Sequence, residues 1–322
     1  MESVCAAILR AFNLKERRVT RDKAGYVCAT DAGMVDVLRV GQTAERIWFR
    51  YHVQEHLHAH GFAGAERLRL SAAGEPFTVY DRETYVVRPH LPYREVSFVN
   101  EEEWRRVLHT VGRMHACLRD TVFEYTPRLP VPDVTALYQK NTDALIGTKR
   151  RILKKGKYAE FDVLFLRMVD EQTEALAEWY SLACSTAYAT QWEEARTRRF
   201  VCHNLLKEEN LLSAMDGVYV RNFAECAPGH HMDDLAALLR RYVAAVPDAP
   251  VPLAESLALY QAENPLAPDA QVVLRAALLF PDKFLKLSAK YYDRNRTWTP
   301  GAFTARMEEV ARGQIDVGRY IR

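Results

Sequence analysis

The sequence lacks three features that would assign it to a specialised class of protein. Its net charge is only +2, from 44 Lys and Arg against 42 Asp and Glu, which argues against a dedicated nucleic-acid binder. No apolar run approaches the roughly 20 residues that a membrane-spanning helix needs. The start, MESVCAAILRAFNLKERR, carries an acid where a secretory signal has basic residues, and its apolar stretch is too short. We therefore expect a cytoplasmic protein with no nucleic-acid partner and no membrane span.

Cysteine is also sparse, and no two cysteines form a CxxC pair. Six cysteines are spread over 322 residues, a pattern that fits reduced, mostly buried thiols. Hydrophobic residues make up 48% and charged residues 27% of the chain, which is the ordinary globular balance and excludes a disordered chain. A chain of this length predicts one large domain or two lobes.

The first third of the chain has the pattern of short strands around one helix. Turn residues separate segments rich in Val, Tyr and Thr. The predicted strands are residues 17–21, 25–30, 34–40, 68–71, 77–80 and 85–88. Residues 43–60 predict the helix. Alternation along the third strand, MVDVLRV, places Arg39 on the same face as Val35 and Val37.

From about residue 93 the sequence turns helical. The predicted helices are residues 100–118, 133–155, 161–186, 232–246, 252–263, 269–280, 283–292 and 302–312. Between them, residues 200–223 predict a loop followed by a β-hairpin with its turn at Asp216–Gly217. This layout resembles a two-lobed protein-kinase-like fold of the α+β class. We expect a small β-rich N-lobe with one helix over residues 1–92 and a larger, mainly α-helical C-lobe over residues 93–322.

The segment FVCHNLLKEENLL (residues 200–212) lies where such a fold carries its chemistry. A phosphotransferase of this type needs an Asp that accepts the hydroxyl proton, an Asn that holds a metal, and a second metal-binding Asp after a hairpin. In the aminoglycoside phosphotransferase group the pattern is HxDxxxxN, followed by a DFD-like strand end. His203 and Asn210 occupy the two ends of this frame. VYVRNF stands where the metal-binding strand is expected, and DDLAALLRR resembles the helix that follows.

Longer phrases extend the resemblance over nearly the whole chain. HLHAHGF, GRMHACL, the loop VCHNLLKEENLL and above all KLSAKYYDRNRTWTP (residues 286–300) resemble the spore coat CotS family. That family is a branch of the aminoglycoside phosphotransferase-like kinases found in spore-forming bacteria. The resemblance implies a kinase-like fold and a place in the spore coat.

Three positions depart from the pattern of an active kinase. Leu205 stands where the catalytic Asp is expected, and a leucine cannot accept a proton, whereas a positioned general base is worth about 10²–10⁴-fold in rate. Asn222 stands where the metal-binding Asp is expected, and a neutral amide is a poor ligand for Mg²⁺. Arg39 replaces the lysine of the third strand, and its planar guanidinium is not an equivalent phosphate clamp.

Part of the nucleotide-binding frame is retained. Glu55 follows Arg39 by sixteen residues on the next helix and is its expected partner, with Glu45 as the second choice. The Arg39–Glu55 pair is therefore the candidate contact for a nucleotide phosphate. Asn210 and Asn222 are the relic metal positions. No glycine-rich loop is present.

Each of these residues also has a plainer interpretation. His203 would be a structural histidine that needs only a hydrogen-bond partner, and Asn210 would brace its loop through the backbone. Asp234 would, by the resemblance, bond the backbone of the His203 loop, or else be an acid favoured by a helix N-terminus. Leu205 is expected to be largely buried, since a leucine gains stability only by packing against apolar groups.

Two further motifs lie outside this frame. Residues 52–56 (HVQEH) match HxxEH, a zinc-protease signature, but such short motifs recur by chance. The run TKRRILKKGK at residues 148–157 holds six basic residues. It predicts a solvated helix face or a contact for an acidic partner.

The leading hypothesis is a spore coat-associated kinase-like protein that is catalytically impaired. It would have a structural or interaction role, through contacts with other spore coat proteins. It would be synthesised in the cytoplasm of a spore-forming bacterium, and no cofactor is expected for it. The alternative is an active small-molecule phosphotransferase that uses ATP and Mg²⁺, with Glu208 or Glu209 in place of the missing base. Whether the protein is an enzyme stays open at this point.

Overall fold

The chain folds into two compact units, and each unit combines segments that are distant in sequence. The computed structural model describes residues 4–22, 25–129, 133–246, 251–292 and 299–313. The first unit comprises Met1–Ser97, Arg106–Arg128 and Arg198–Pro228. The second comprises Phe98–Arg105, Leu129–Thr197 and Gly229–Arg322. The loop and hairpin after residue 198 therefore group with the N-terminal strands, which differs from a simple division at residue 92.

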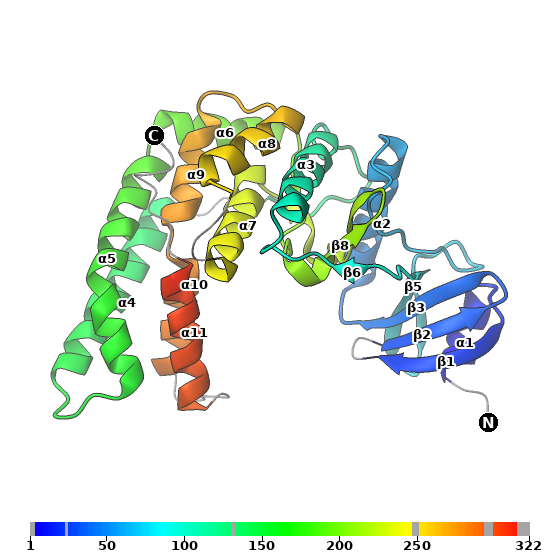
Figure 1. The fold of residues 1–322 in the computed structure, drawn as a ribbon, viewed down its shortest axis with the longest axis horizontal. Helices are drawn as coiled ribbons and strands as arrows, with labels where there is room; N and C mark the ends of the chain where they lie inside the picture. The colour runs from blue at the N-terminus through cyan, green and yellow to red at the C-terminus, as the bar shows by residue number, and fades with distance from the viewer. Residues whose placement is uncertain (1–3, 23–24, 130–132, 247–250, 293–298, 314–322) are drawn as a thin grey trace. The chain divides into compact units, whose positions relative to one another are not determined.

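A five-stranded antiparallel sheet is the main element of the first unit, with strand order β1-β2-β3-β5-β4 (Figure 1). Its strands are β1 (Glu16–Asp22), β2 (Gly25–Thr30), β3 (Gly33–Val40), β4 (Thr78–Tyr80) and β5 (Glu83–Pro89). Helix α1 (Val4–Ala11) packs with Val35 and Val37 of β3 in one buried cluster. Helix α2 (Ala44–Ala59) packs with Leu38 and Val40 of β3 in another. Because successive side chains of a strand point to opposite faces, the two helices cover opposite faces of the sheet.

Short strands and turns complete the first unit. A three-stranded sheet has the order β6-β8-β9, and a separate two-stranded ladder pairs β7 with β10. These elements are β6 (Arg94–Glu95), β7 (Val201–Cys202), β8 (Leu211–Ala214), β9 (Gly217–Val220), β10 (Ala227–Pro228) and the 3₁₀ turns η1 (Glu208–Asn210) and η2 (Phe223–Glu225). The predicted hairpin turn at Asp216–Gly217 is confirmed by the β8–β9 pairing. Helix α3 (Glu101–Cys117) continues from the second unit into the first.

The second unit is helical in its described part. Its helices are α4 (Val134–Leu153), α5 (Glu160–Ala183), α6 (Thr186–Thr197), α7 (His231–Ala245), α8 (Leu253–Glu263), α9 (Ala270–Leu279), α10 (Asp282–Tyr292) and α11 (Pro300–Arg312). Aromatic side chains fill its core: Phe161 of α5 stacks on Tyr291 of α10 at 3.8 Å between ring centroids. Trp104 stacks on Tyr242 at 4.0 Å, and its Nε1–H donates to Ser256 Oγ (3.0 Å).

The structure departs from the predicted elements at three places. Helix α1 (Val4–Ala11) was not predicted, since a single helix was expected before residue 92. The predicted strand at residues 68–71 is wrong: the Arg69 N–H donates to the Val87 carbonyl (2.8 Å), but no ladder forms there. The long helix predicted over residues 161–186 ends at Ala183 instead. Ser185 then caps a new helix, α6, because its Oγ accepts the Tyr188 N–H (3.2 Å).

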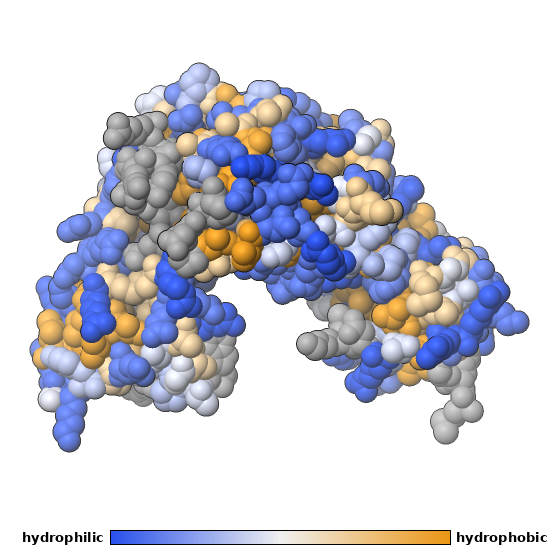
Figure 2. Space-filling model, viewed as in Figure 1, coloured by the Kyte–Doolittle hydropathy of each residue, from blue (hydrophilic) through white to orange (hydrophobic). Residues whose placement is uncertain are grey.

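The cysteines are mostly buried and unpaired, as the sequence predicts. All six cysteines are free, and four of them are buried. Within the described ranges, no helix combines the length and the apolar character needed to cross a bilayer. Figure 2 shows strongly hydrophilic residues over the region where Figure 1 draws α1 and β1.

Candidate functional site

Two neighbouring strands of the first unit carry opposite charges on the face that α2 covers. Asp36 of β3 and Arg88 of β5 are direct partners in the strand register. The Arg88 Nε–H donates to Asp36 Oδ2 (3.0 Å), and each residue is only 8% exposed. Alternation places Asp36 on the same side as Leu38 and Val40. A charge buried this deeply needs a partner, and each residue supplies one to the other.

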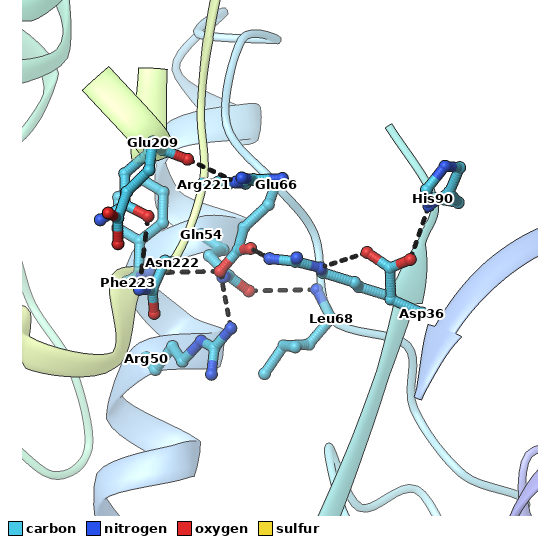
Figure 3. Close-up of polar contacts among 12 residues, drawn as sticks. Asp36, Arg50, Gln54, Glu66, Leu68, His90, Glu209, Arg221, Asn222 and Phe223 are labelled. Carbon is cyan, nitrogen blue, oxygen red and sulfur yellow. Dashed lines mark hydrogen bonds and ion pairs between the residues drawn. The ribbon is translucent and has the colours of Figure 1, made fainter. Parts of the chain in front are cut away.

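Glu66 connects this pair to helix α2. It follows α2 in the chain and is 2% exposed. Arg88 Nη1 donates to Glu66 Oε2, while Arg50 Nη2 (2.7 Å) and Gln54 Nε2 (2.9 Å), both on α2, donate to Oε1 (Figure 3). The Gln54 Oε1 in turn accepts the Leu68 N–H (3.1 Å). One carboxylate is therefore shared by two guanidinium groups, one from a strand and one from a helix.

We call Asp36, Arg88, Glu66 and Arg50 the buried ion network. Burial alone would raise the pKa of Glu66, but the guanidinium groups of Arg50 and Arg88 outweigh it and hold that pKa far below its ordinary range. Burial likewise opposes the charge of Arg88, and Glu66 and Asp36 outweigh it and raise the Arg88 pKa. Two anions and two cations cancel, so the network carries no net charge. Removing any one member would leave a buried charge without compensation.

The network extends at both ends. At one end His90 Nδ1 lies 2.6 Å from Asp36 Oδ1, and the His90 side chain is 31% exposed. At the other end the Phe223 N–H donates to Glu66 Oε1 (3.2 Å), as Figure 3 shows. Phe223 directly follows Asn222, the relic metal position. The buried ion network thus contacts the backbone of the segment that would carry the metal-binding Asp of an active kinase.

His203 uses both ring nitrogens to hold its own loop. It is fully buried, and its Nδ1 accepts the Leu205 N–H (3.1 Å). Since Nδ1 is an acceptor, Nε2 carries the proton and donates to the Arg221 carbonyl (3.1 Å). The ring also packs edge-on against Phe223, at 4.6 Å between centroids. These contacts favour the structural interpretation of His203.

Asn210 and Asn222, which the sequence predicts as relics of a metal site, lie together. Asn210 is 3% exposed, and its Nδ2 donates to the Leu205 carbonyl (2.9 Å). Asn222 Nδ2 lies 3.4 Å from Asn210 Oδ1. Asn222 adopts a left-handed backbone conformation with φ of 65°, which Asn tolerates better than most residues. The structure places both amides at one spot, where they brace the loop; metal binding there stays a prediction.

The expected burial of Leu205 is met only in part. Leu205 is half-buried, whereas its neighbour Leu206 is 2% exposed and packs in the core. The alternative base Glu209 is exposed and ion-pairs with Lys207. Its carbonyl oxygen accepts the Arg221 Nε–H (2.8 Å). The hydrogen bonds of His203 and Asn210 fix the backbone on both sides of Leu205, and that geometry turns the second leucine inward.

The expected pairing of Arg39 with Glu55 is also wrong. Arg39 ion-pairs with Glu83 (3.2 Å), and its side chain is 65% exposed. Glu55 is held by Arg67 through two hydrogen bonds of 2.6 Å. The reason is strand alternation: Arg39 shares a face with Val37, which packs towards α1, whereas α2 covers the opposite face. The charged residue of β3 that faces α2 is Asp36.

Asp234 lies in the first turn of α7 and is 3% exposed. The neighbouring Asp233 has its pKa raised to about 7, first by burial and then by repulsion from Asp234. This repulsion reflects two acids placed side by side at a helix N-terminus. The hydrogen bond expected between Asp234 and the His203 loop stays a prediction.

The HVQEH motif at residues 52–56 has other uses for its side chains. His52 stacks on Trp48, Glu55 binds Arg67, and His56 Nε2 lies 2.8 Å from the Cys117 carbonyl. Burial lowers the pKa of His56. Among the described residues, no three His, Cys, Asp or Glu side chains lie close enough together to hold a metal ion. These contacts are those of a helix packed against its neighbours.

The basic run at residues 148–157 is partly neutralised within the second unit. Lys149 ion-pairs with Asp170 (2.5 Å) and Lys155 with Asp162 (2.9 Å). Arg150 and Lys154 are exposed. Residues 293–298 of the C-terminal phrase KLSAKYYDRNRTWTP lie outside the described residues.

Sequence reasoning missed the buried ion network. The available signal was weak but present: Asp36 and Arg88 interrupt otherwise apolar strands, and Glu66 and Arg50 lie beside apolar residues. A charge at an inward strand position needs a partner of opposite sign. Which charges meet, however, depends on the register of β3 against β5 and on the packing of α2.

The family comparison matches almost the whole chain. The family described as "Spore coat putative kinase YutH" matches residues 6–322. The comparison with curated proteins returned no match.

Solved structures share the fold at low sequence identity. An aminoglycoside phosphotransferase from Alicyclobacillus acidocaldarius is 18% identical, with a TM-score of 0.81 over 97% of this chain and 92% of that one. The spectinomycin phosphotransferase APH(9)-Ia in complex with AMP is 9% identical, with a TM-score of 0.67 over 96% of each chain. A microcompartment-associated aminopropanol kinase is 14% identical, with a TM-score of 0.60 over 99% and 98%. The predicted kinase-like fold is confirmed.

Proposed function

Because the chain belongs to the spore coat YutH family, we propose that it is a spore coat protein that keeps the kinase-like fold without phosphoryl transfer. The family and the fold are those of kinases, and the proposal concerns what this chain does with them. It would act through contacts with other coat proteins, in the coat layer of a spore-forming bacterium. No nucleotide is needed for that role.

The observation that carries the proposal is the reversed charge order in the buried ion network. A kinase holds the nucleotide phosphates with a lysine on its third strand, and a glutamate on the following helix fixes that lysine. Here the third-strand residue that faces the helix is an acid, Asp36, and the buried ion on the helix is a base, Arg50. An acid at that strand position repels a phosphate. The nearby cations Arg50 and Arg88 are already bound to Glu66 and Asp36.

The loop departures support the same proposal independently. Leu205 offers no proton acceptor where one is required. The Asn222 amide donates to Asn210 Oδ1, and the Asn210 amide donates to the Leu205 carbonyl of the loop. Neither brings the negative charge that Mg²⁺ favours. Base, metal carboxylate and phosphate clamp are thus all replaced in one site.

The direct test is nucleotide binding by the full-length protein. A ligand present at 100 times its Kd stabilises a protein by about 2.7 kcal/mol, so thermal melts with ATP, with and without Mg²⁺, will reveal binding. We expect no change in Tm, and phosphate release from ATP no faster than in buffer. A clear ATP-dependent rise in Tm, confirmed by calorimetry, would contradict the proposal.

The active-kinase alternative has its own decisive variants. If Glu208 or Glu209 replaces the missing base, turnover will be measurable, and E208Q or E209Q will abolish it. The matched control is E95Q, another exposed acid of the first unit that pairs with Arg221 (3.6 Å). Turnover that depends on Glu208 or Glu209 but not on Glu95 would establish the alternative.

A further inference from the structure

We propose that β1 is a docking edge for an acidic, extended polypeptide segment, which would add to the five-stranded sheet as a further strand. The sheet order makes β1 an outer strand, paired with β2 on one side. On the other side no strand of the described chain pairs with it. Such an edge presents backbone donors and acceptors to an incoming chain.

The charge of this edge specifies the partner. Lys15, Arg17, Arg18 and Arg21 are all exposed. No carboxylate in the described residues forms an ion pair with any of these four side chains. Asp31 is near enough that its pKa is lowered, first by a hydrogen bond from the Lys15 N–H and also by the charge of Arg17. Hydrophilic surface over this region is visible in Figure 2.

The placement of these cations favours an extended strand as the partner over a flat anionic surface. Val19 packs towards α1, so Arg21, two residues on, lies on that face of the sheet. Arg18 lies on the opposite face, and Arg17 lies at a bulge in the β1–β2 register. Cations on both faces of one strand match the two faces of an added strand with consecutive acids. A planar anionic surface would meet only one face.

The same charges disfavour a second copy of this chain. Two β1 strands paired edge to edge would set like charges opposite each other, which is destabilising. Positive edges of this kind protect a sheet against self-association while leaving it open to a partner of opposite charge. The basic run at residues 148–157 is less suited to binding an acidic partner, because Lys149 and Lys155 are already ion-paired.

The test uses the full-length protein and a short peptide in which pairs of consecutive Glu residues alternate with single Thr residues, so that both faces of the extended peptide carry acids. A peptide with Gln in place of every Glu is its neutral counterpart. We expect fluorescence anisotropy to detect binding of the acidic peptide alone, and this binding to weaken as salt rises. The triple variant R17E/R18E/R21E should bind about tenfold more weakly or worse, the change expected from losing three exposed ion pairs. The double variant R150E/K154E reverses two exposed cations of α4 and should bind like the unmodified protein.

Hydrogen exchange distinguishes strand addition from simple charge attraction. The acidic peptide should slow exchange of β1 amides, and a version N-methylated at alternate residues should bind poorly and protect nothing. Equal binding of the N-methylated peptide, or tighter binding of a short DNA strand, would overturn the proposal in favour of a general polyanion surface. Undiminished binding by the triple variant would also overturn it. If that variant does not fold, R18E and R21E are tested singly, and unchanged affinity in both overturns it equally.

Discussion

Arg88 bridges two acids: it pairs with Asp36 directly across the β3–β5 register and with Glu66 from the segment after α2. The Arg88 guanidinium thereby links β3, β5 and the segment after α2. Helix α2 joins through Glu66, which accepts hydrogen bonds from Arg50 and Gln54. In a kinase the corresponding polar centre of the small lobe serves the nucleotide phosphates. Here its charges satisfy one another, and the first unit gains a structural ion network.

The first prediction concerns the stability that depends on Glu66. Replacing it in E66L leaves Arg50 and Arg88 buried without their shared carboxylate, and breaking such an arrangement costs about 3–5 kcal/mol. Urea unfolding followed by circular dichroism will measure the loss. The matched control is E83Q, which removes the exposed pair with Arg39 and should cost about 0–1 kcal/mol. Equal, small losses in both variants would contradict a cooperative buried network.

The second prediction concerns pH. The pKa of Glu66 in the folded protein lies far below its ordinary value of 4.5, because Arg50 and Arg88 outweigh the effect of burial. Below about pH 4.5 the unfolded chain binds a proton at this residue and the folded chain does not. The stability from Glu66 is therefore fully present above that pH and falls as pH decreases. Unfolding free energies measured from pH 7 to pH 3 should fall less steeply in E66Q than in the unmodified protein. Parallel curves would contradict this assignment.

Most of the strands and helices could be predicted from the sequence, although α1 and α6 were not. The partners of the charges could not be predicted. Alternation correctly grouped Arg39 with Val35 and Val37. Alternation alone does not show which face of β3 is covered by α2. A shift by one residue moves every side chain of the strand to the opposite face. The kinase pattern, which expects a cation on the third strand, predicts Arg39 as the inward charge, whereas the inward charge is Asp36.

The contacts within the loop around Leu205 could likewise not be predicted from the sequence. The motif predicts the positions of His203 and Asn210, and in the structure Asn210 lies beside Asn222. Which of the two consecutive leucines is buried depends on the Leu205 backbone, whose N–H donates to the His203 side chain and whose carbonyl accepts from Asn210. The spacing of apolar residues carries no such information.

The third prediction tests the backbone at Asn222. Its φ of 65° lies in the left-handed region, which costs most residues about 1–2 kcal/mol and costs glycine little. We therefore expect N222A to be destabilised by roughly that amount and N222G to be close to the unmodified protein. Both variants lose the amide contact with Asn210 equally, so their difference isolates the backbone term. Equal stability of the two variants in urea unfolding would show that the side chain alone matters.

The fourth prediction concerns cysteine reactivity. Burial is the first cause that raises the pKa of Cys5, and likewise of Cys226, to about 12 in each case, so both remain thiols at neutral pH. Cys184 is exposed. Limited iodoacetamide treatment of the folded protein should therefore modify Cys184 first and leave Cys5 and Cys226 intact until the protein is denatured. Peptide mass spectrometry will show the order, and early modification of Cys226 would contradict the burial of that thiol.

The last prediction asks whether the lost metal site can be rebuilt. L205D/N222D restores a base and a metal carboxylate, and Asp at position 222 would lie beside the Asn210 amide oxygen, which is a further oxygen ligand. An ion at ten times its Kd stabilises by about 1.4 kcal/mol, so Mg²⁺ should raise the Tm of the double variant and not that of the unmodified protein. Adding N210A should remove the effect. Adding R39K should change nothing, because Arg39 is exposed and pairs with Glu83. A Mg²⁺ response that appears only with R39K would show that the third-strand cation, and not Asp36, belongs to the site.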